Sequence, residues 1–392
     1  MGIQKLSVRG FRSLRGVEWV PGSLNVLIGP NASGKSNLLR ALALLQKSVH
    51  GELPEEMVRL GGIAPLLWDG QASTIEWCLD TADGAHYELT LRKLGSTSNY
   101  VVDHEALTRR GPAPAGSMAE KSPEPRRVLL RDRVAGSTFD PEPRSVVVDG
   151  VTLPSDQTLL SQVGGTPFGI GEAFEFCSAV GSWTIHHDLR VDPEAPLRQA
   201  AVTRDERRIA ADGQNLVPVL HTLYTSEREF KRAADDAMRA AFGDDYEELV
   251  FPPAADQRVQ LRVRWRSLKR EQSAADLSDG TLRFLLLVAI LSTPSPGELI
   301  AIDEPETGLH PSMLAVVADL ARAASERTQV ILTTHSPQLL DAFTESPPTV
   351  TVTGRSEGQT TLSVLDPEEL RRWLAEYSLG ALHRSGELEG MA

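Results

Sequence analysis

The sequence predicts an α/β fold in which helices flank a mixed, largely parallel sheet, with a smaller antiparallel β-subdomain beside it. Continuous apolar runs of strand length are typical of buried parallel strands. Such runs are present at Leu24–Ile28, Leu299–Ile302 and Gln329–Thr333. Two alternating segments on either side of Asp83-Gly84, a hairpin signal, predict the antiparallel part. These segments are Thr74–Leu79 and His86–Leu91.

The other elements follow from periodicity. A helix from about Gly34 to Gln46 is expected after the first apolar strand, because its leucines fall on one side at helical spacing. Helical patterning returns later, at Gln214–Tyr224, Glu227–Phe242, Leu282–Leu291, Pro311–Ser325 and near Pro367–Tyr377. Further strands are expected at Gln4–Val8, Val259–Trp265, Thr349–Thr353 and Thr360–Val364.

Strong α/β signals at both ends of the chain enclose an irregular middle. We therefore expect a head domain made of two separated halves, 1–94 and 271–392. Residues 95–270 would be a mixed α/β insertion or regulatory region, with helices at about 214–242. By composition, residues 111–125 are expected to form a loop or mobile linker.

Composition limits the class of protein. The chain has 392 residues and 41% hydrophobic content, enough for a sizeable core. Its two cysteines, Cys78 and Cys177, are too few for a disulfide framework and lack metal-ligand spacing. The start has no signal-peptide core, and the longest apolar run, Phe284–Leu291, is far shorter than a membrane span. These features predict a cytoplasmic protein without a membrane partner.

The charge balance argues against a generally basic coat that would bind nucleic acid, since the formal net charge is −13. Local basic clusters remain, for which solvated faces of the insertion are the favoured explanation and a local phosphate-binding patch is the alternative. The clusters lie at Arg126–Arg133, Arg204–Arg208, Arg228–Arg232 and Arg262–Arg270.

A phosphate-binding loop is predicted at Gly29–Ser36, where GPNASGKS fits the pattern G-x-x-x-x-G-K-[ST] between a strand and a helix. Glycines let backbone N–H groups converge on phosphate oxygens, and the helix N-terminus adds partial positive charge. Lys35 would reach the β- and γ-phosphates, and Ser36 would ligate Mg²⁺. A chance glycine turn is the alternative. The residues expected to hold nucleotide here are Gly29, Asn31, Ser33, Gly34, Lys35, Ser36 and Asn37.

Adjacent carboxylates follow the second apolar strand, in LIAIDEPETGLHP. Asp303 at the end of this strand would hold Mg²⁺, and Glu304 would orient or deprotonate the attacking water. An ordinary exposed turn is the alternative for this pair. Glu306 and His310 are expected to shape the loop.

Two further motifs have the right context. His335 in TTHSP ends the third apolar strand and could donate to a γ-phosphate. In LSDGT, Ser278 and Gly280 lie before a helix, whose N-terminus could accept an anion. The other histidines considered, His86, His186, His187 and His221, are given structural roles.

In this order, GPNASGKS, LSDGT, LIAIDEPETGLHP and TTHSP resemble the ATP-binding-cassette class of P-loop ATPases. The RecF/OLD/SMC-like group, which includes bacterial AAA_21-type ATPases of the "AAA family", is the most similar. The resemblance implies ATP and Mg²⁺ as cofactors and a head-to-tail homodimer with two ATP molecules between the heads. Lys35, Ser36, Asp303, Glu304 and His335 would act in cis, while Ser278 and Gly280 would close over the other subunit's γ-phosphate.

The chain also departs from this class. Asp279 and Thr281 replace residues of the usual LSGGQ signature, and Asp279 would repel a triphosphate unless it points away. The usual glutamine after the first strands is hard to place, with Gln71 as a candidate. Three relatives are disfavoured. A transporter ATPase would have fewer residues between the phosphate loop and the signature, and an SMC-type protein would need long coiled coils, which the sequence does not predict. An OLD-type nuclease would carry a fused TOPRIM domain, for which the stretch after His335 is expected to be too short.

Two functions are carried forward. The first is an ATP-hydrolysing switch whose ATP-driven dimerisation is coupled to DNA, in repair or in defence against foreign DNA. The alternative is a regulatory or scaffold ATPase that controls a separately encoded effector, such as a TOPRIM-like nuclease or toxin, docked on the middle region. A chain that only binds ATP is a third option, against which Glu304 argues.

Overall fold

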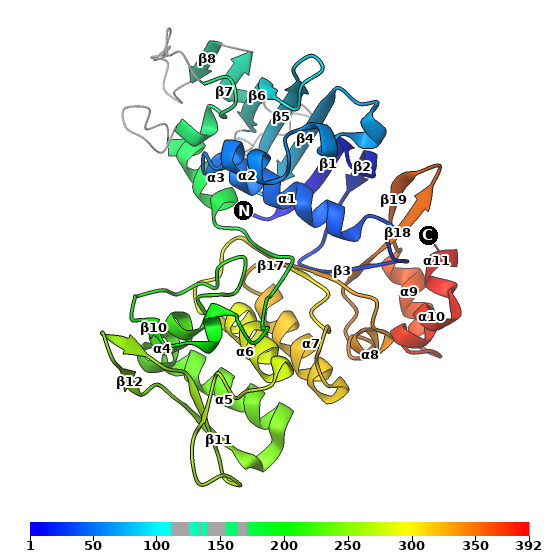
Figure 1. Cartoon of the computed structure of the whole chain (residues 1–392). Coiled ribbons are helices and arrows are strands. Elements are labelled where there is room, and N and C mark those ends of the chain that lie inside the picture. The colour runs from blue at the N-terminus through cyan, green and yellow to red at the C-terminus, as the bar shows by residue number, and fades with distance from the viewer. Residues whose placement is uncertain (111–124, 133–134, 139–153, 163–170, 392) are drawn as a thin grey trace, which may run out of the picture. The chain divides into compact units, whose positions relative to one another are not determined.

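A computed structural model describes residues 1–110, 125–132, 135–138, 154–162 and 171–391 (Figure 1). The chain forms two compact units. Unit 1 contains Met1–Gly22, Gly29–Trp183 and Thr353–Val364; unit 2 contains Ser23–Ile28, Thr184–Val352 and Leu365–Ala392. The loop expected at 111–125 falls almost entirely outside the described residues.

Unit 1 is built on an antiparallel sheet whose described strands run in the order β2-β1-β4-β5-β6-β7-β8. Period-two alternation gives this sheet one apolar face, because successive side chains of a strand point to opposite sides. The strands are β1 (Ile3–Phe11), β2 (Leu14–Trp19), β4 (Thr74–Thr81), β5 (Ala85–Lys93), β6 (Tyr100–Arg109), β7 (Arg126–Asp132) and β8 (Ala135–Thr138).

Helices cover the apolar face of this sheet (Figure 1). On β4 the buried residues are Ile75, Trp77 and Leu79, and the Trp77 indole Nε1 donates to the carbonyl of Ala41 at 3.1 Å. Ala41 belongs to the helix that follows the glycine loop, so this contact fixes the helix on the sheet. The helices are α1 (Lys35–Val49), α2 (Leu53–Arg59) and α3 (Gly171–Gly181).

Unit 2 is built on a parallel sheet in the order β18-β3-β17-β16-β9. Its strands are buried runs, as expected where both faces are covered. Their bounds are β3 (Leu24–Ile28), β9 (Thr184–His186), β16 (Leu299–Asp303), β17 (Gln329–Thr333) and β18 (Thr349–Ser356). From Thr353 onward, β18 belongs to unit 1, where β19 (Gln359–Val364) lies beside β2.

The rest of unit 2 is helical, with two small antiparallel sheets. Its central helix, α6, is apolar on all sides over its second half, and every residue from Phe284 to Leu291 is buried. The helices are α4 (Leu216–Ser226), α5 (Arg228–Phe242), α6 (Asp279–Ser292), α7 (Pro311–Ser325), α8 (Pro337–Asp341), α9 (Pro367–Leu374), α10 (Leu379–Ser385) and α11 (Glu387–Gly390). The short strands are β10 (Ala201–Val202), β11 (Tyr246–Val250), β12 (Pro253–Ala254), β13 (Arg258–Val259), β14 (Arg262–Trp265) and β15 (Gln272–Ser273). In the described part of the chain, no helix has the length and apolar character needed to span a membrane.

The predicted α/β fold with an antiparallel subdomain is confirmed, with two local differences. The single strand expected at Val259–Trp265 is split, because Gln260 donates its N–H to Pro252 and the flanking segments join different sheets. The boundary expected between residues 94 and 95 separates β5 from β6, which are adjacent strands of one sheet. The compact units are divided differently from the expected head and insertion, and that domain organisation remains a prediction.

Candidate functional site

The glycine loop of unit 1 has a backbone that only glycine tolerates at two positions. Gly29 and Gly34 have φ angles of 138° and 114°, in the region that side chains disfavour. A Cβ on Gly29 would lie 2.1 Å from the carbonyl oxygen of Thr353, and one on Gly34 would lie 2.1 Å from Oγ1 of Thr360. The loop is therefore pressed against β18 and β19, and this close approach requires glycine.

Lys35 is held inside this loop. Its side chain is 5% exposed, and Nζ donates to the carbonyls of Gly29 at 2.8 Å and Pro30 at 3.1 Å. A buried ammonium at the start of α1 offers a fixed positive charge beside the helix N-terminus. These features fit a phosphate group bound at the loop. Ser36 follows in the first turn of α1 and is half-buried, while Asn31 is exposed.

Hydroxyl groups from outside the motif brace the loop. Ser33 Oγ lies 2.5 Å from Thr353 Oγ1, and Thr360 Oγ1 donates to the Ser33 carbonyl at 2.7 Å. Asn37 Nδ2 donates to Ser13 Oγ at 2.8 Å, and that hydroxyl is 2.7 Å from Thr360 Oγ1. Sequence reasoning missed Ser13, Thr353 and Thr360. Nothing in the sequence marked these residues as loop contacts except that each lies near the end of a strand or in the first hairpin.

Asp303 and Glu304 lie at the carboxyl end of β16 in unit 2. Asp303 pairs in register with Thr333 of β17, and the Thr333 hydroxyl donates to its carboxylate. The same hydroxyl accepts the N–H of Glu304 at 3.1 Å. Glu304 has a φ of 47°, uncommon for a residue with a side chain, and is exposed. At this strained turn the two adjacent carboxylates have different surroundings: Asp303 is half-buried, whereas Glu304 is exposed to solvent.

The loop after Glu304 is tied to the end of β17. His335 Nε2 lies 3.6 Å from Glu304 Oε1. Glu306 accepts hydrogen bonds from Thr334 Oγ1 at 2.6 Å and from the N–H of His335 at 3.0 Å. Burial raises the pKa of Glu306, and the hydrogen bonds that it accepts oppose this shift. Glu306 thus shapes the loop, and so does His310, whose Nδ1 caps α7 through the N–H of Ser312.

His187, to which sequence reasoning gave a structural role, lies beside Asp303. It directly follows β9, whose residue His186 pairs with Ile302, so it emerges beside Asp303. Its Nδ1 lies 3.6 Å from Asp303 Oδ2, and neither ring nitrogen makes a hydrogen bond with a described residue. The sequence did not indicate a strand before His187, because β9 has only three residues. Gln71, the candidate for the missing glutamine, is exposed in unit 1 and donates to Asp69.

The LSDGT segment forms the N-terminus of α6. Ser278 is the N-cap, and its Oγ accepts the N–H of Thr281 at 3.1 Å. A Cβ on Gly280 would lie 2.7 Å from the carbonyl oxygen of Gly308. Gly280 therefore allows this segment to pack closely against the loop that follows Glu304 and Glu306.

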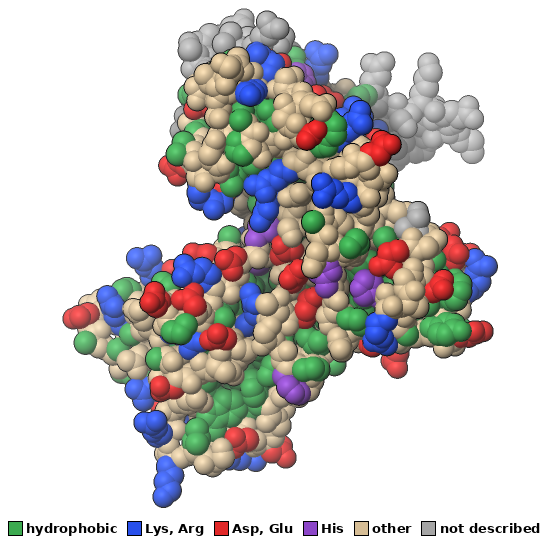
Figure 2. All heavy atoms as spheres, turned by 45° about the vertical axis from the view of Figure 1, so that its right-hand side comes forward, with side chains coloured by type: hydrophobic (Ala, Val, Ile, Leu, Met, Phe, Trp, Pro, Cys, Tyr) green, Lys and Arg blue, Asp and Glu red, His purple; other side chains and the backbone are tan. Residues whose placement is uncertain are grey.

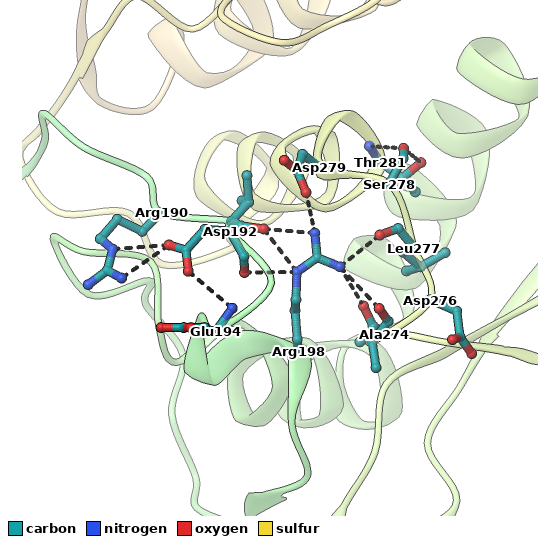
Figure 3. A network of polar contacts seen from close by, with 12 residues as sticks. Arg190, Asp192, Glu194, Arg198, Ala274, Asp276, Leu277, Ser278, Asp279 and Thr281 are labelled. Carbon is teal, nitrogen blue, oxygen red and sulfur yellow. Dashed lines mark hydrogen bonds and ion pairs between the residues drawn. The ribbon is translucent and has the colours of Figure 1, made fainter.

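Arg198 holds the LSDGT segment in place (Figure 3). Its side chain is 6% exposed, and its guanidinium forms an ion pair with Asp279. The same group donates to the carbonyls of Leu277 at 2.8 Å and Val191 at 2.7 Å. Further acceptors are the carbonyls of Asp192, Ala274 and Ala275. The charge of Asp279, which the sequence marked as a departure, is thus neutralised within unit 2.

The expected residues form two groups. Gly29, Asn31, Ser33, Gly34, Lys35, Ser36 and Asn37 lie in unit 1, whereas Ser278, Gly280, Asp303, Glu304 and His335 lie in unit 2. Within unit 2, parallel register brings the ends of β16 and β17 together. The meeting of both groups at one nucleotide remains a prediction.

The glycine loop, the carboxylates at the end of β16 and the LSDGT segment at the N-terminus of α6 define the class: an ABC-type P-loop ATPase head of the RecF/SMC-like kind. The sequence model of the AAA_21 family, described as "AAA domain, putative AbiEii toxin, Type IV TA system", matches residues 24–67 and 182–341. Because the match covers more than half of the chain, the protein belongs to this family.

Individual relatives agree with this assignment. A segment of 43 residues, 11% of this chain, is 46% identical to the DNA replication and repair protein RecF of Desulforamulus reducens (strain ATCC BAA-1160 / DSM 100696 / MI-1), but spans only 12% of that relative. Two solved SMC head domains have the same fold, each with a TM-score of 0.55. One, bound to the C-winged helix domain of ScpA, is 14% identical, with 95% of this chain and 100% of that chain covered. The other has an extended coiled coil and is bound to the C-terminal domain of ScpA derived from Pyrococcus furiosus; it is 15% identical, with coverage of 96% and 99%.

Proposed function

We propose that the protein binds ATP with Mg²⁺ and hydrolyses it, with the glycine loop binding the phosphates and the carboxylates at the end of β16 serving the metal and the attacking water. The observation that carries this proposal is the parallel register of β3, which leads covalently into the loop at Gly29. Leu27 pairs with Thr333, and the Leu27 carbonyl accepts the N–H of Thr334 at 3.0 Å. Chain connectivity therefore starts the loop from the sheet edge where β16 and β17 end, the usual ligand position in α/β sheets.

The side chains take separate roles in this proposal. Lys35 and the loop amides bind the phosphates, and Ser36 and Asp303 hold Mg²⁺, which supplies charge neutralisation at the phosphates when it is bound. Glu304 orients the attacking water and accepts its proton, while His335 donates to the γ-phosphate. His187 lies close enough to Asp303 to be a further ligand when a transition metal such as Mn²⁺ replaces Mg²⁺, because Mg²⁺ prefers oxygen ligands. Two donor atoms each about 2.1 Å from one ion lie within about 4.2 Å of each other, and the observed separation is 3.6 Å.

The signature segment supports a homodimer formed around ATP. Ser278 and Gly280 at the N-terminus of α6 would meet the γ-phosphate of the other subunit. The repulsion expected from Asp279 is reduced, because Arg198 neutralises it and a carboxylate paired in this way no longer opposes an anion.

The proposal is tested by mass measurement of Glu304→Gln with and without ATP-Mg²⁺. Loss of the base should leave binding intact, stop hydrolysis and accumulate an ATP-bound dimer. Glu326→Gln, at the exposed end of α7, is the matched control and should turn over ATP normally. Unchanged turnover in Glu304→Gln would assign the base to another residue.

For the output of the switch, we propose first a coupling to DNA, which the partial likeness to RecF supports. Binding to phosphates requires unpaired basic groups, so the clusters at 204–208 and 262–270 bear on this idea. Arg207 is paired with Asp205 and Glu227. Arg264 is likewise paired with Glu248 and Glu271. On the face seen in Figure 2, basic and acidic side chains are interspersed.

The alternative proposal is a head that controls a separately encoded effector protein. An exposed aromatic pair at the C-terminal end of α9, Trp373 and Tyr377, has ring centroids 6.1 Å apart and is the kind of surface that protein partners bury. DNA-stimulated ATP turnover at low salt would support the DNA function. Stimulation that is absent at every salt concentration, together with nucleotide-dependent capture of a protein partner that Trp373→Ala abolishes, would support the effector instead.

A further inference from the structure

The outer face of the unit 1 sheet contains a hollow of about 480 Å³, opposite the face that α1 covers. A sheet face turned away from the core is usually lined by scattered polar residues. Here it gathers a thiol, two imidazoles and several carboxylates. The residues around the central cluster include Lys5, Arg9, Glu18, Thr90 and His104.

Strand geometry brings the cluster together. Cys78 and Asp80 are two residues apart on β4 and therefore point to the same side. Asp80 pairs with His86 of β5, and Cys78 pairs with Glu88. All four side chains are half-buried, whereas their neighbours Trp77 and Leu79 point into the core. The hairpin thus aligns four donor groups that are separated by as many as ten positions in the sequence.

The donor atoms converge on the imidazole of His86. Its Nδ1 lies 2.7 Å from Asp80 Oδ1, and its Nε2 lies 3.3 Å from Glu88 Oε1. The sulfur of Cys78 is 3.9 Å from Nδ1. One ligand atom from each of Cys78, Asp80 and His86 falls within 4.8 Å of the other two. In the described part of the chain, no other three residues of these types are grouped so closely.

We propose that Cys78, Asp80 and His86 bind a zinc ion. Tetrahedral Zn²⁺ has bonds of about 2.3 Å to sulfur and about 2.1 Å to nitrogen, which places these atoms about 3.6 Å apart. By the same geometry Nδ1 and the carboxylate oxygen would lie about 3.4 Å apart. The observed separations are 3.9 Å from sulfur to Nδ1 and 2.7 Å from Nδ1 to Asp80 Oδ1, so ion binding shifts both side chains by less than about 1 Å. A thiolate with an imidazole selects a borderline-soft cation, and the carboxylate completes a set that favours Zn²⁺ over Mg²⁺.

Glu88 completes the arrangement without binding the ion. It accepts the N–H of His86 Nε2, which leaves Nδ1 as the ligand atom and orients the ring, as carboxylates commonly do for metal-bound histidines. The ion takes the place of the proton between His86 Nδ1 and Asp80, so binding releases protons from the histidine and the thiol. Three protein ligands leave one coordination position for water or an exogenous group.

The sequence did not suggest this site because Cys78 has no second cysteine near it. Its partners come from across a hairpin, and the other thiol, Cys177, donates to the carbonyl of Val49 elsewhere in unit 1. The proposed site is separate from the glycine loop and does not depend on ATP hydrolysis.

Cobalt substitution tests the proposal on the full chain. The protein is stripped with a chelator, kept in millimolar Mg²⁺ without nucleotide, and titrated with Zn²⁺ or Co²⁺. One equivalent should bind, and Co²⁺ should give a sulfur-to-cobalt charge-transfer band in the near ultraviolet. Cys78→Ser should abolish the band, Asp80→Asn and His86→Gln should weaken binding at least tenfold, and Cys177→Ser should match the wild type.

A chemical measurement on the wild-type chain avoids any folding defect of the variants. One equivalent of Zn²⁺ should slow alkylation of Cys78 at least tenfold and leave the rate at Cys177 unchanged. A cobalt band that persists in Cys78→Ser would overturn the proposal, as would equal alkylation of Cys78 with and without Zn²⁺.

Discussion

Arg198 and Asp279 form an ion pair between the segment after β9 and the first turn of α6, 81 positions apart in the sequence. The arginine is almost fully buried, whereas Asp279 is largely exposed. Most of the hydrogen bonds that the Arg198 guanidinium donates go to backbone carbonyls of two segments, Val191–Asp192 and Ala274–Leu277 (Figure 3). A planar guanidinium can satisfy several such acceptors at once, and an ammonium cannot.

We expect Arg198→Ala to lower the free energy of unfolding by about 3 kcal/mol, because several buried carbonyls lose their donor. Arg198→Lys should recover little of this loss. The matched control is Arg190→Ala, since Arg190 is an exposed neighbour paired with Asp192, and it should cost less than about 1 kcal/mol. Chemical denaturation measures all three variants. Equal effects of Arg190→Ala and Arg198→Ala would contradict this role for the network.

The bracing of the glycine loop gives a prediction for nucleotide affinity. Thr353→Val keeps the shape of β18 but removes the hydroxyl that contacts Ser33, so ATP affinity should fall about tenfold, the equivalent of one lost hydrogen bond. Lys35→Ala should abolish binding, because the buried ammonium is lost. Thr349→Val, at the first residue of the same strand, should leave affinity unchanged. Titration with a fluorescent ATP analogue measures these affinities, and wild-type binding by Lys35→Ala would mean that the loop is misassigned.

The sequence predicted the residues that local motifs carry, and missed those that the fold brings in from a distance. Asp303 ends an apolar strand, and Lys35 and His335 come within a few residues of one, so strand, loop and residue type can be recognised in short segments of sequence. Thr353 contacts Ser33 across 320 positions, and Arg198 has no motif of its own. Such partners depend on strand order, which periodicity does not specify. For the same reason, the short strand β9 concealed His187.

Glu306 gives a prediction for pH. Burial raises its pKa in the folded state, so the folded protein binds a proton more tightly than the unfolded chain does. The stabilisation that follows is fully present below the ordinary glutamate pKa of 4.5 and is lost as pH rises through the raised pKa of the folded state. The neutral variant Glu306→Gln does not titrate there. The stability of the wild type relative to this variant should therefore fall as pH rises from about 4 toward neutrality.

Denaturation of both proteins at a series of pH values checks this prediction. Glu326→Gln, at an exposed position, is the matched control and should follow the wild type at every pH. A constant difference between wild type and Glu306→Gln would show that Glu306 keeps the same pKa in both states.

The position of His187 gives a prediction for the cation at Asp303. If its ring is a ligand of the ATP-bound metal, Mn²⁺ bound to ¹⁵N-labelled protein with unlabelled ATP should show a nitrogen coupling in pulsed electron paramagnetic resonance. His187→Gln should remove that coupling, because an amide oxygen then takes the place of the imidazole. The variant should also lower the preference for Mn²⁺ over Mg²⁺ about tenfold, since imidazole favours the transition metal. His221→Gln, whose ring packs on Phe251, is the matched control. A coupling of equal strength in His187→Gln would place His187 outside the coordination sphere, and its contact with Asp303 would then serve only to orient the carboxylate.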